Sequence, residues 1–271
     1  MELNTEIKGQ GYPILCLHGH PGSSDSMSVF TNYLSKKYQT IAPDLRGYGK
    51  SKYRQDFAMD EHLVDLEQLL DKLKIDRCLL LGWSLGGIIA MELALLMPER
   101  FSGTILIATA AKPASIRTSN TWQDQLFTGI AGVINLIKPG WQWNIDTFGK
   151  RSLFRFLIEN HTPEAYGYLA QEGTTAYFKT SKVATNALFN EIRKGYDRLS
   201  DLERLDFPCL MLSGECDRNI TPQASQQTAE HLPDCEYINY PQVAHLFPWE
   251  IPDKVIQDIQ QWLNNHQSVI G

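Results

Sequence analysis

Residues 82–86 form the pattern G-x-S-x-G, in which Ser84 stands between two glycines. A pattern this short arises by chance in about one chain in ten of this length, so its surroundings decide its meaning. An apolar run, 77–81, precedes it, and a helix-like segment, 87–94, follows it. A serine on a sharp turn from strand to helix projects its hydroxyl from the sheet edge, where free helix N–H groups stabilise a developing oxyanion. The pattern therefore predicts that Ser84 is a nucleophile that attacks a carbonyl.

The rest of the chain alternates short apolar runs with helix-length periodic segments, which is typical of parallel strands joined by crossover helices. The predicted strands are 13–17, 38–42, 78–81, 103–108, 209–213 and 236–239. The predicted helices are 26–37, 58–73, 86–97, 221–232 and 252–264. The sequence therefore predicts an α/β fold with a mostly parallel, twisted sheet flanked by helices.

This alternation stops between residues 112 and 206, where the pattern is helical with Gly and Pro interruptions. We interpret 112–206 as a helical cap inserted after the sixth core strand, with 1–111 and 207–271 forming the core. The cap holds about a third of the chain but three of the 6 Trp, six of the 11 Phe and four of the 11 Tyr. This bias favours a lid that lines an apolar pocket, with Trp141 and Trp143 as candidates. The alternative interpretation is that these aromatic side chains only pack the cap onto the core.

Two further motifs accompany the serine pattern. The loop His18-Gly19-His20-Pro21-Gly22 follows the first predicted strand, and the segment D-L-R-G-Y-G-K-S at 44–51 follows the second. In this order the three motifs resemble those of the α/β-hydrolase fold family, in its branch with an H-G-x-P loop. The resemblance covers nearly the whole chain and is least specific in the cap. It implies an α/β-hydrolase fold and a serine hydrolase, with 44–51 in a structural role in which Arg46 pairs with a carboxylate.

The family arranges its catalytic residues in the order serine, acid, histidine. Of the histidines that follow Ser84, only His245 comes after a predicted strand, on a loop that precedes the last helix. A serine hydroxyl needs such a base within hydrogen-bond reach. His245 is therefore the candidate base, although Ala244 stands where the family usually has glycine.

The resemblance places the acid after the predicted strand 209–213, where Asp217 stands. A carboxylate there fixes the histidine tautomer and stabilises the imidazolium that forms in the transition state. Glu215 is the only close competitor, since 108–111 offers no carboxylate after the preceding strand. The predicted catalytic residues are thus Ser84, Asp217 and His245.

The same resemblance implies an oxyanion hole formed by the backbone N–H groups of His20 and Leu85. Donors already aimed at the tetrahedral oxygen need no reorganisation, and the loss of one costs about 10²- to 10³-fold in rate. Pro21 is a candidate for a cis peptide bond that turns the His20 amide inward. Trp83 and Leu246, which are adjacent in sequence to Ser84 and His245, are further candidates for the substrate pocket, in addition to Trp141 and Trp143.

A serine at position 84 excludes the haloalkane dehalogenases and epoxide hydrolases of this family, which need a carboxylate there. The expected reaction is hydrolysis of a small to medium apolar carboxylic ester through an acyl-enzyme. The sequence leaves open other chemistry of the same three residues: C–C bond hydrolysis, cofactor-free perhydrolysis or haloperoxidation, and acyl transfer. It also leaves open a receptor-like protein that binds a ligand with little turnover.

Composition limits the partners. A net charge of −6 and a pI of about 5.7 disfavour nucleic acid. Residues 1–11 lack a signal peptide's pattern, and the most apolar stretch, 85–97, is too short to span a bilayer. Five cysteines without C-x-x-C spacing indicate reduced thiols and a cytoplasmic protein. We expect no metal and no cofactor, and the sequence leaves a homodimer open.

Overall fold

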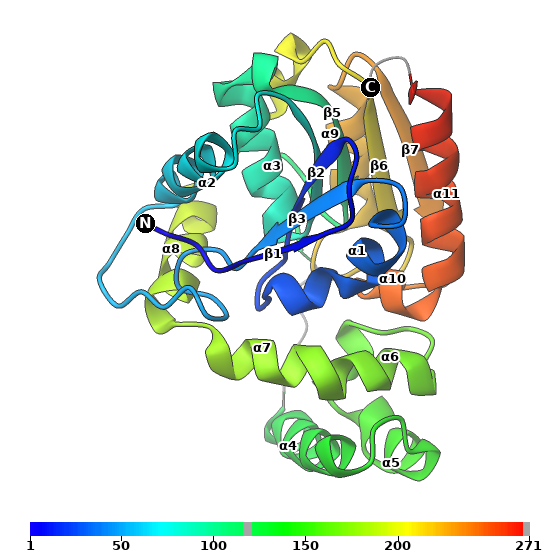
Figure 1. Ribbon diagram of the computed structural model, residues 1–271. Coiled ribbons are helices and arrows are strands. Elements are labelled where there is room, and N and C mark those ends of the chain that lie inside the picture. The colour runs from blue at the N-terminus through cyan, green and yellow to red at the C-terminus, as the bar shows by residue number, and fades with distance from the viewer. Residues whose placement is uncertain (116–120, 268–271) are drawn as a thin grey trace.

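The computed structural model describes residues 1–115 and 121–267 and contains one seven-stranded sheet (Figure 1). The strand order is β1-β3-β2-β4-β5-β6-β7, in which β1 runs antiparallel to β3 and every other neighbouring pair is parallel. The strands are β1 (Thr5–Lys8), β2 (Pro13–Leu17), β3 (Gln39–Pro43), β4 (Cys78–Trp83), β5 (Phe101–Ile107), β6 (Cys209–Gly214) and β7 (Cys235–Tyr240).

Helices cover both faces of this sheet. The helices between or after the strands are α1 (Ser28–Leu34), α2 (Glu61–Lys72), α3 (Leu85–Leu96), α9 (Pro222–Glu230), α10 (Phe247–Glu250) and α11 (Pro252–Asn265). The helices α2 and α3 share one apolar cluster with the sheet, and α1 and α11 share the other. Neighbouring residues of β2 divide between these clusters: Leu15 and Leu17 face one, and Ile14 and Cys16 face the other. This alternation of side chains along a buried strand places the sheet between two helical layers.

Between β5 and β6 the described part of the chain is helical. It contains α4 (Trp122–Ile137), α5 (Gln142–Thr147), α6 (Pro163–Tyr168), α7 (Thr174–Lys179) and α8 (Lys182–Arg193), with short helical turns such as η4 (Leu153–Phe156) and η5 (Leu169–Gly173). We call this segment the insertion. Figure 1 shows it at the bottom of the view, except that α8 rises along the side of the sheet.

The α/β fold with a mostly parallel sheet is confirmed, and two details of the sequence analysis need correction. The insertion follows the fifth strand of the sheet, β5, and not the sixth. Over the described residues that precede it, the chain forms five strands, β1 to β5. The strand β1 itself was missed. Its residues Thr5, Glu6, Ile7 and Lys8 are mostly polar, as suits an edge strand, and they lack the apolar run by which the other strands were recognised.

Of the helices described, none combines the length and apolarity that crossing a bilayer requires. The cysteines are free thiols, and three of them, Cys16, Cys78 and Cys209, are buried within strands.

Candidate active site

Ser84 occupies the turn between β4 and α3, with φ 53° and ψ −115°. A serine with positive φ is strained, and such strain is maintained only where the surroundings enforce it. Here the Ser84 amide donates to the carbonyl of Ile107 on β5 at 2.8 Å. A Cβ at Gly86 would collide with the carbonyl oxygen of Leu17, and one at Gly82 with that of Gly86. The two glycines are therefore needed for the close approach of β2, β4 and α3 that holds the serine in this turn.

The hydroxyl of Ser84 lies in hydrogen-bond contact with His245. The distance from Nε2 of His245 to Oγ of Ser84 is 3.2 Å, and the distance from Nδ1 to Oδ2 of Asp217 is 2.7 Å. The carboxylate and the imidazole are almost fully buried. The structure thus brings together the three side chains that the sequence analysis selected, from positions far apart in the chain.

The turn after β6 holds the Asp217 carboxylate. Its second oxygen, Oδ1, accepts hydrogen bonds from the backbone amides of Asn219 and Ile220 at 2.8 and 3.0 Å. Hydrogen bonds from backbone N–H groups favour the charged form of a carboxylate and fix its orientation. The competitor Glu215 instead accepts from the backbone of Gln242 at an exposed position.

The loop after β2 is braced by His18, which is fully buried. Its Nε2 accepts a hydrogen bond from the Leu45 amide at 3.1 Å, and its Nδ1 lies 2.8 Å from the carbonyl of Gly19. The ring is therefore neutral with its proton on Nδ1, the only tautomer that satisfies both contacts. Burial lowers the pKa of His18 to about 4, in agreement with this assignment.

The next histidine of this loop, His20, precedes a cis bond to Pro21. Its ring lies 3.0 Å from the hydroxyl of Tyr48. Burial, and to a smaller extent His18, lowers the pKa of His20 to about 4, so this ring is neutral at physiological pH. Both candidate oxyanion residues, His20 and Leu85, line the same cavity as Ser84.

This cavity has a volume of ≈ 360 Å³ and contains both Ser84 and His245 in its wall. Apolar side chains form most of the remaining wall: Ile88 of α3, Leu188, Phe189 and Ile192 of α8, Pro113 and Ile220, with Ser115 and Asn219 as polar neighbours. The insertion therefore does contribute apolar lining, through α8 and Pro113.

Trp141 and Trp143, which the sequence analysis proposed for the pocket, do not line this cavity. They lie at the start of α5, with their rings 4.9 Å apart, and are 38% and 50% exposed. The abundance of aromatic residues in the insertion had suggested a lid that lines the pocket through these tryptophans. It could not show which of its helices faces the serine, because that depends on how the insertion folds back on the core.

Trp83 and Leu246 do not line the cavity either, and both are buried. The Trp83 ring lies 5.9 Å from the ring of His245 and 4.7 Å from that of Trp249, so it packs between these two side chains. The Leu246 amide donates to the carbonyl of Leu157 in the insertion at 2.9 Å. Trp83 and Leu246 are next to Ser84 and His245 in the sequence, but their buried side chains are not part of the cavity lining.

Glu250 of α10 is a residue that the sequence analysis missed. Its Oε1 accepts from the amide of Ala244, the residue before His245, at 3.0 Å. Its Oε2 accepts from the amides of Glu159 and Asn160 in the insertion at 3.2 and 2.6 Å. Burial raises the pKa of Glu250. One carboxylate thus ties the loop of the base to the insertion, and no local sequence pattern indicates such a contact.

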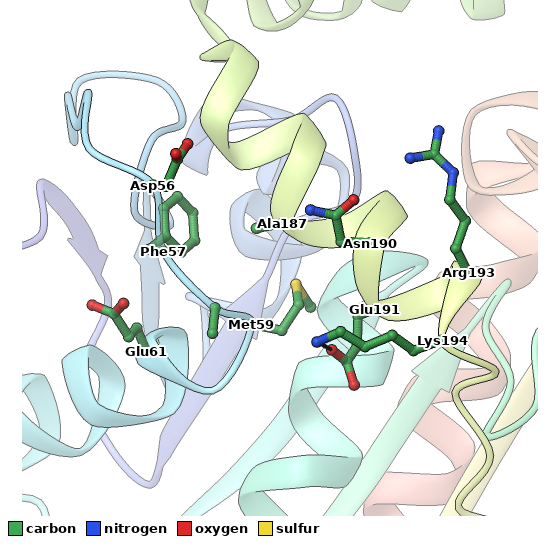
Figure 2. A pocket seen from close by; sticks show the side chains of 10 residues that line it. Asp56, Phe57, Met59, Glu61, Ala187, Asn190, Glu191, Arg193 and Lys194 are labelled. Atoms are coloured by element: carbon green, nitrogen blue, oxygen red, sulfur yellow. Dashed lines mark hydrogen bonds and ion pairs between the residues drawn. The ribbon is translucent and has the colours of Figure 1, made fainter.

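A larger hollow lies elsewhere, between α8 and the segment before α2 (Figure 2). Its volume is ≈ 650 Å³, and Phe57, Met59 and Ala187 form its apolar part. Among the described residues, its lining contains no Ser, Cys or His, and Glu191 and Lys194 pair with each other at 3.2 Å. The serine and histidine that contact each other line the smaller cavity at Ser84.

Over residues 1–115 and 121–267, no three His, Cys, Asp or Glu side chains gather in a way that could hold a metal ion.

Comparisons with known proteins agree with this architecture. A family model described as alpha/beta hydrolase fold matches residues 12–141. A pimeloyl-[acyl-carrier protein] methyl ester esterase of Nitrosomonas europaea is 26% identical over 262 residues, which cover 94% of this chain and 96% of that protein.

Solved structures are similar over nearly the whole chain. A thermophilic esterase from Thermogutta terrifontis has a TM-score of 0.71 at 24% identity, covering 97% of this chain and 93% of that one. A meta-cleavage product hydrolase from Pseudomonas fluorescens IP01 has a TM-score of 0.70 at 18% identity, covering 97% and 94%. With the sheet order and the match at residues 12–141, these similarities show that the chain has the α/β-hydrolase fold.

Proposed function

We propose that this protein is a serine esterase that hydrolyses small to medium apolar carboxylic esters through an acyl-enzyme. The observation that carries the proposal is the position of His245, whose ring contacts Ser84 on one side and Asp217 on the other. A hydroxyl paired with a base, and a base oriented by a carboxylate, is the arrangement that activates a serine.

In the proposed first half-reaction, Nε2 of His245 accepts the proton as Oγ of Ser84 bonds to the ester carbon. The carbonyl oxygen becomes an oxyanion that accepts hydrogen bonds from the amides of His20 and Leu85. Protonated His245 then gives its proton to the alkoxy oxygen, and the alcohol leaves. Asp217 stabilises the imidazolium throughout and takes no proton.

In the second half-reaction, water replaces the alcohol. His245 removes a proton from the water as its oxygen attacks the acyl carbon, the same two amides receive the oxyanion, and the proton returns to Ser84 as the acid departs. Ser84 and His245 both line the cavity, so the substrate approaches them from there.

The cavity supports the proposed substrate class. At ≈ 360 Å³ it is near the small end of the range for ligand sites, and its wall of Ile, Leu, Phe and Pro side chains suits an apolar group. The relative from Nitrosomonas europaea is named as a methyl ester esterase, which agrees with a small alcohol part. We place the reaction in the cytoplasm, where the thiols buried in β2, β4 and β6 remain reduced.

The test compares two serines of the same cavity. Ser84→Ala is expected to lower kcat on p-nitrophenyl butyrate by about 10⁵- to 10⁶-fold, since it removes the nucleophile. Ser115→Ala is the matched control, because Ser115 lines the cavity, and it should change kcat by less than about threefold.

A series of p-nitrophenyl esters of increasing chain length, with burst kinetics, then distinguishes the alternatives. Turnover that is fastest on short and medium chains supports the esterase. A stoichiometric burst without turnover would instead support a receptor-like protein, and equal losses in the two serine variants would contradict the role of Ser84.

A further inference from the structure

The helix α4 packs against the rest of the insertion with its polar side. Asp124 pairs with Arg155 at 2.7 Å, and the Thr128 hydroxyl accepts from the Leu153 amide at 2.9 Å. Asn135 donates to the carbonyl of Tyr166 at 2.7 Å. The inner side of this helix is therefore held by hydrogen bonds and an ion pair.

The outer side of α4 is apolar. We define the α4 face as Trp122, Leu126, Ile130, Val133, Leu136 and Ile137, which recur at spacings of one to four residues along one side of the helix. Five of these six are exposed, among them Val133 at 60% and Ile137 at 81%, and Ile130 is partly exposed. A helix at the surface of a globular protein normally turns its apolar stripe inward. In α4 this arrangement is reversed.

The α4 face belongs to the layer of the insertion that lies farthest from the sheet (Figure 1). Exposed Trp141 and Trp143 follow it in the chain, and a Cβ added at Gly129 or Gly132 would meet no atom within 4 Å. Contiguous apolar surface of this kind marks an interaction site with a membrane or a protein.

Local charge indicates which partner fits. Residues 121–158 contain four basic side chains (Lys138, Lys150, Arg151 and Arg155) and two acidic ones (Asp124 and Asp146), whereas the whole chain has 25 basic and 31 acidic residues. Asp124 and Asp146 pair with Arg155 and Lys150, so Lys138 and Arg151 give this segment a net charge of +2, whereas the net charge of the whole chain is −6. Positive charge attracts an anionic surface, and it opposes the pairing of this face with the same face of a second copy.

We propose that the α4 face is a docking surface for an anionic lipid bilayer, on which α4 lies in the plane of the interface. A helix with an apolar side, tryptophans near both ends and flanking cations has the composition of an interfacial helix. Docking there would present the insertion, and with it the cavity lined by α8, to apolar esters that partition into lipid.

The test measures binding to vesicles of phosphatidylcholine with and without phosphatidylglycerol. It uses Ser84→Ala protein, so that the result is independent of turnover and of the proposed esterase activity. The protein is expected to co-sediment with the anionic vesicles, with a blue shift of tryptophan emission as Trp122, Trp141 and Trp143 enter the interface. It should bind more weakly to pure phosphatidylcholine.

Val133→Glu on the α4 face is expected to weaken vesicle binding about tenfold or more, because it replaces a lipid-facing side chain by a charge. Asn186→Glu is the control: it adds a charge at an exposed helical position of α8, outside the α4 face. Glutamate favours helix more than valine or asparagine does, so α4 and α8 should remain intact in these variants.

Equal vesicle binding by the two variants would overturn the proposal, and so would the absence of binding to anionic vesicles. A concentration-dependent dimer that Val133→Glu abolishes would also overturn it, since the face would then be a contact between protein copies.

Discussion

A single buried carboxylate, that of Glu250, connects the loop of the base to the insertion. It accepts hydrogen bonds from three backbone amides, those of Ala244, Glu159 and Asn160. Because one of the three precedes His245 directly, the carboxylate fixes the place from which the imidazole reaches Ser84. In the proposed reaction Glu250 touches no reacting atom, and we therefore propose it as a positioning residue.

Glu250→Gln is expected to lower kcat by about 10- to 100-fold with little change in KM. A glutamine has one acceptor oxygen, and its NH₂ group would face a backbone donor, so at least one buried amide loses its partner. A small displacement of a base is enough for a rate loss of this size. Steady-state kinetics on a short p-nitrophenyl ester, with circular dichroism to verify folding, measure the effect.

Glu215→Gln is the control, because Glu215 also accepts from a backbone amide of this loop region but at an exposed position. Similar kcat values for the two variants would mean that the contacts of Glu250 do not position the base.

At this scale the sequence indicated which side chains lie together in the structure, because each of them follows a strand. Ser84, Asp217 and His245 each follow β4, β6 or β7, and parallel strands bring their carboxyl ends to one edge of the sheet. Glu250 could not be predicted, because its role depends on three amides from two distant segments. Trp83 and Leu246 were predicted as residues of the substrate pocket, but they do not line the cavity, because proximity in sequence to Ser84 and His245 does not decide whether a side chain faces it.

At the scale of elements, periodicity predicted the central strands and their helices because these segments bury continuous apolar runs. The edge strand β1 has no such run and pairs through its backbone with β3, so the pattern could not reveal it. The boundaries of the predicted helices shifted by a few residues, as with α2, which begins at Glu61 where 58 was expected.

The insertion shows that the apolar content of a helix does not predict which way its apolar side faces. Its helices α4 and α8 both carry apolar side chains, but α8 turns Leu188, Phe189 and Ile192 toward the cavity while α4 turns its stripe outward. The orientation of α4 is set by the partners of Asp124, Thr128 and Asn135 in other segments. Aromatic content therefore indicated an apolar insertion without indicating which helix lines the pocket.

At the scale of the whole molecule, a contact between Glu172 in η5 and Ser28 in α1 joins the insertion to the core. The Ser28 hydroxyl donates to Oε1 of Glu172 at 2.8 Å. Burial is the largest cause that raises the pKa of Glu172 to about 7; Asp25 and Glu6 act in the same direction, and the hydrogen bond from Ser28 and the charge of Lys8 act against it. The folded protein therefore binds this proton more tightly than the unfolded chain, in which the pKa is near 4.5.

This difference predicts a pH-dependent stability. The contribution of Glu172 to the free energy of unfolding is largest below pH 4.5 and is lost as the pH rises toward and through about 7. Glu172→Gln keeps an acceptor for Ser28 and cannot ionise. Its melting temperature, measured from pH 5 to pH 8.5, should therefore rise relative to that of the wild-type protein as the pH increases.

Glu203→Gln, at an exposed position near the end of the insertion, serves as the control and should follow the wild-type curve. A constant difference in melting temperature between Glu172→Gln and wild type across this range would contradict the assignment.

The central claim, that Ser84 is activated by His245, has a direct chemical test. Wild-type protein is treated with a fluorophosphonate, and the labelled residue is located by peptide mass spectrometry. The account predicts one adduct, on the peptide that contains Ser84, and no adduct in Ser84→Ala. Labelling that persists in Ser84→Ala, or that falls on another residue of the wild-type protein, would contradict it.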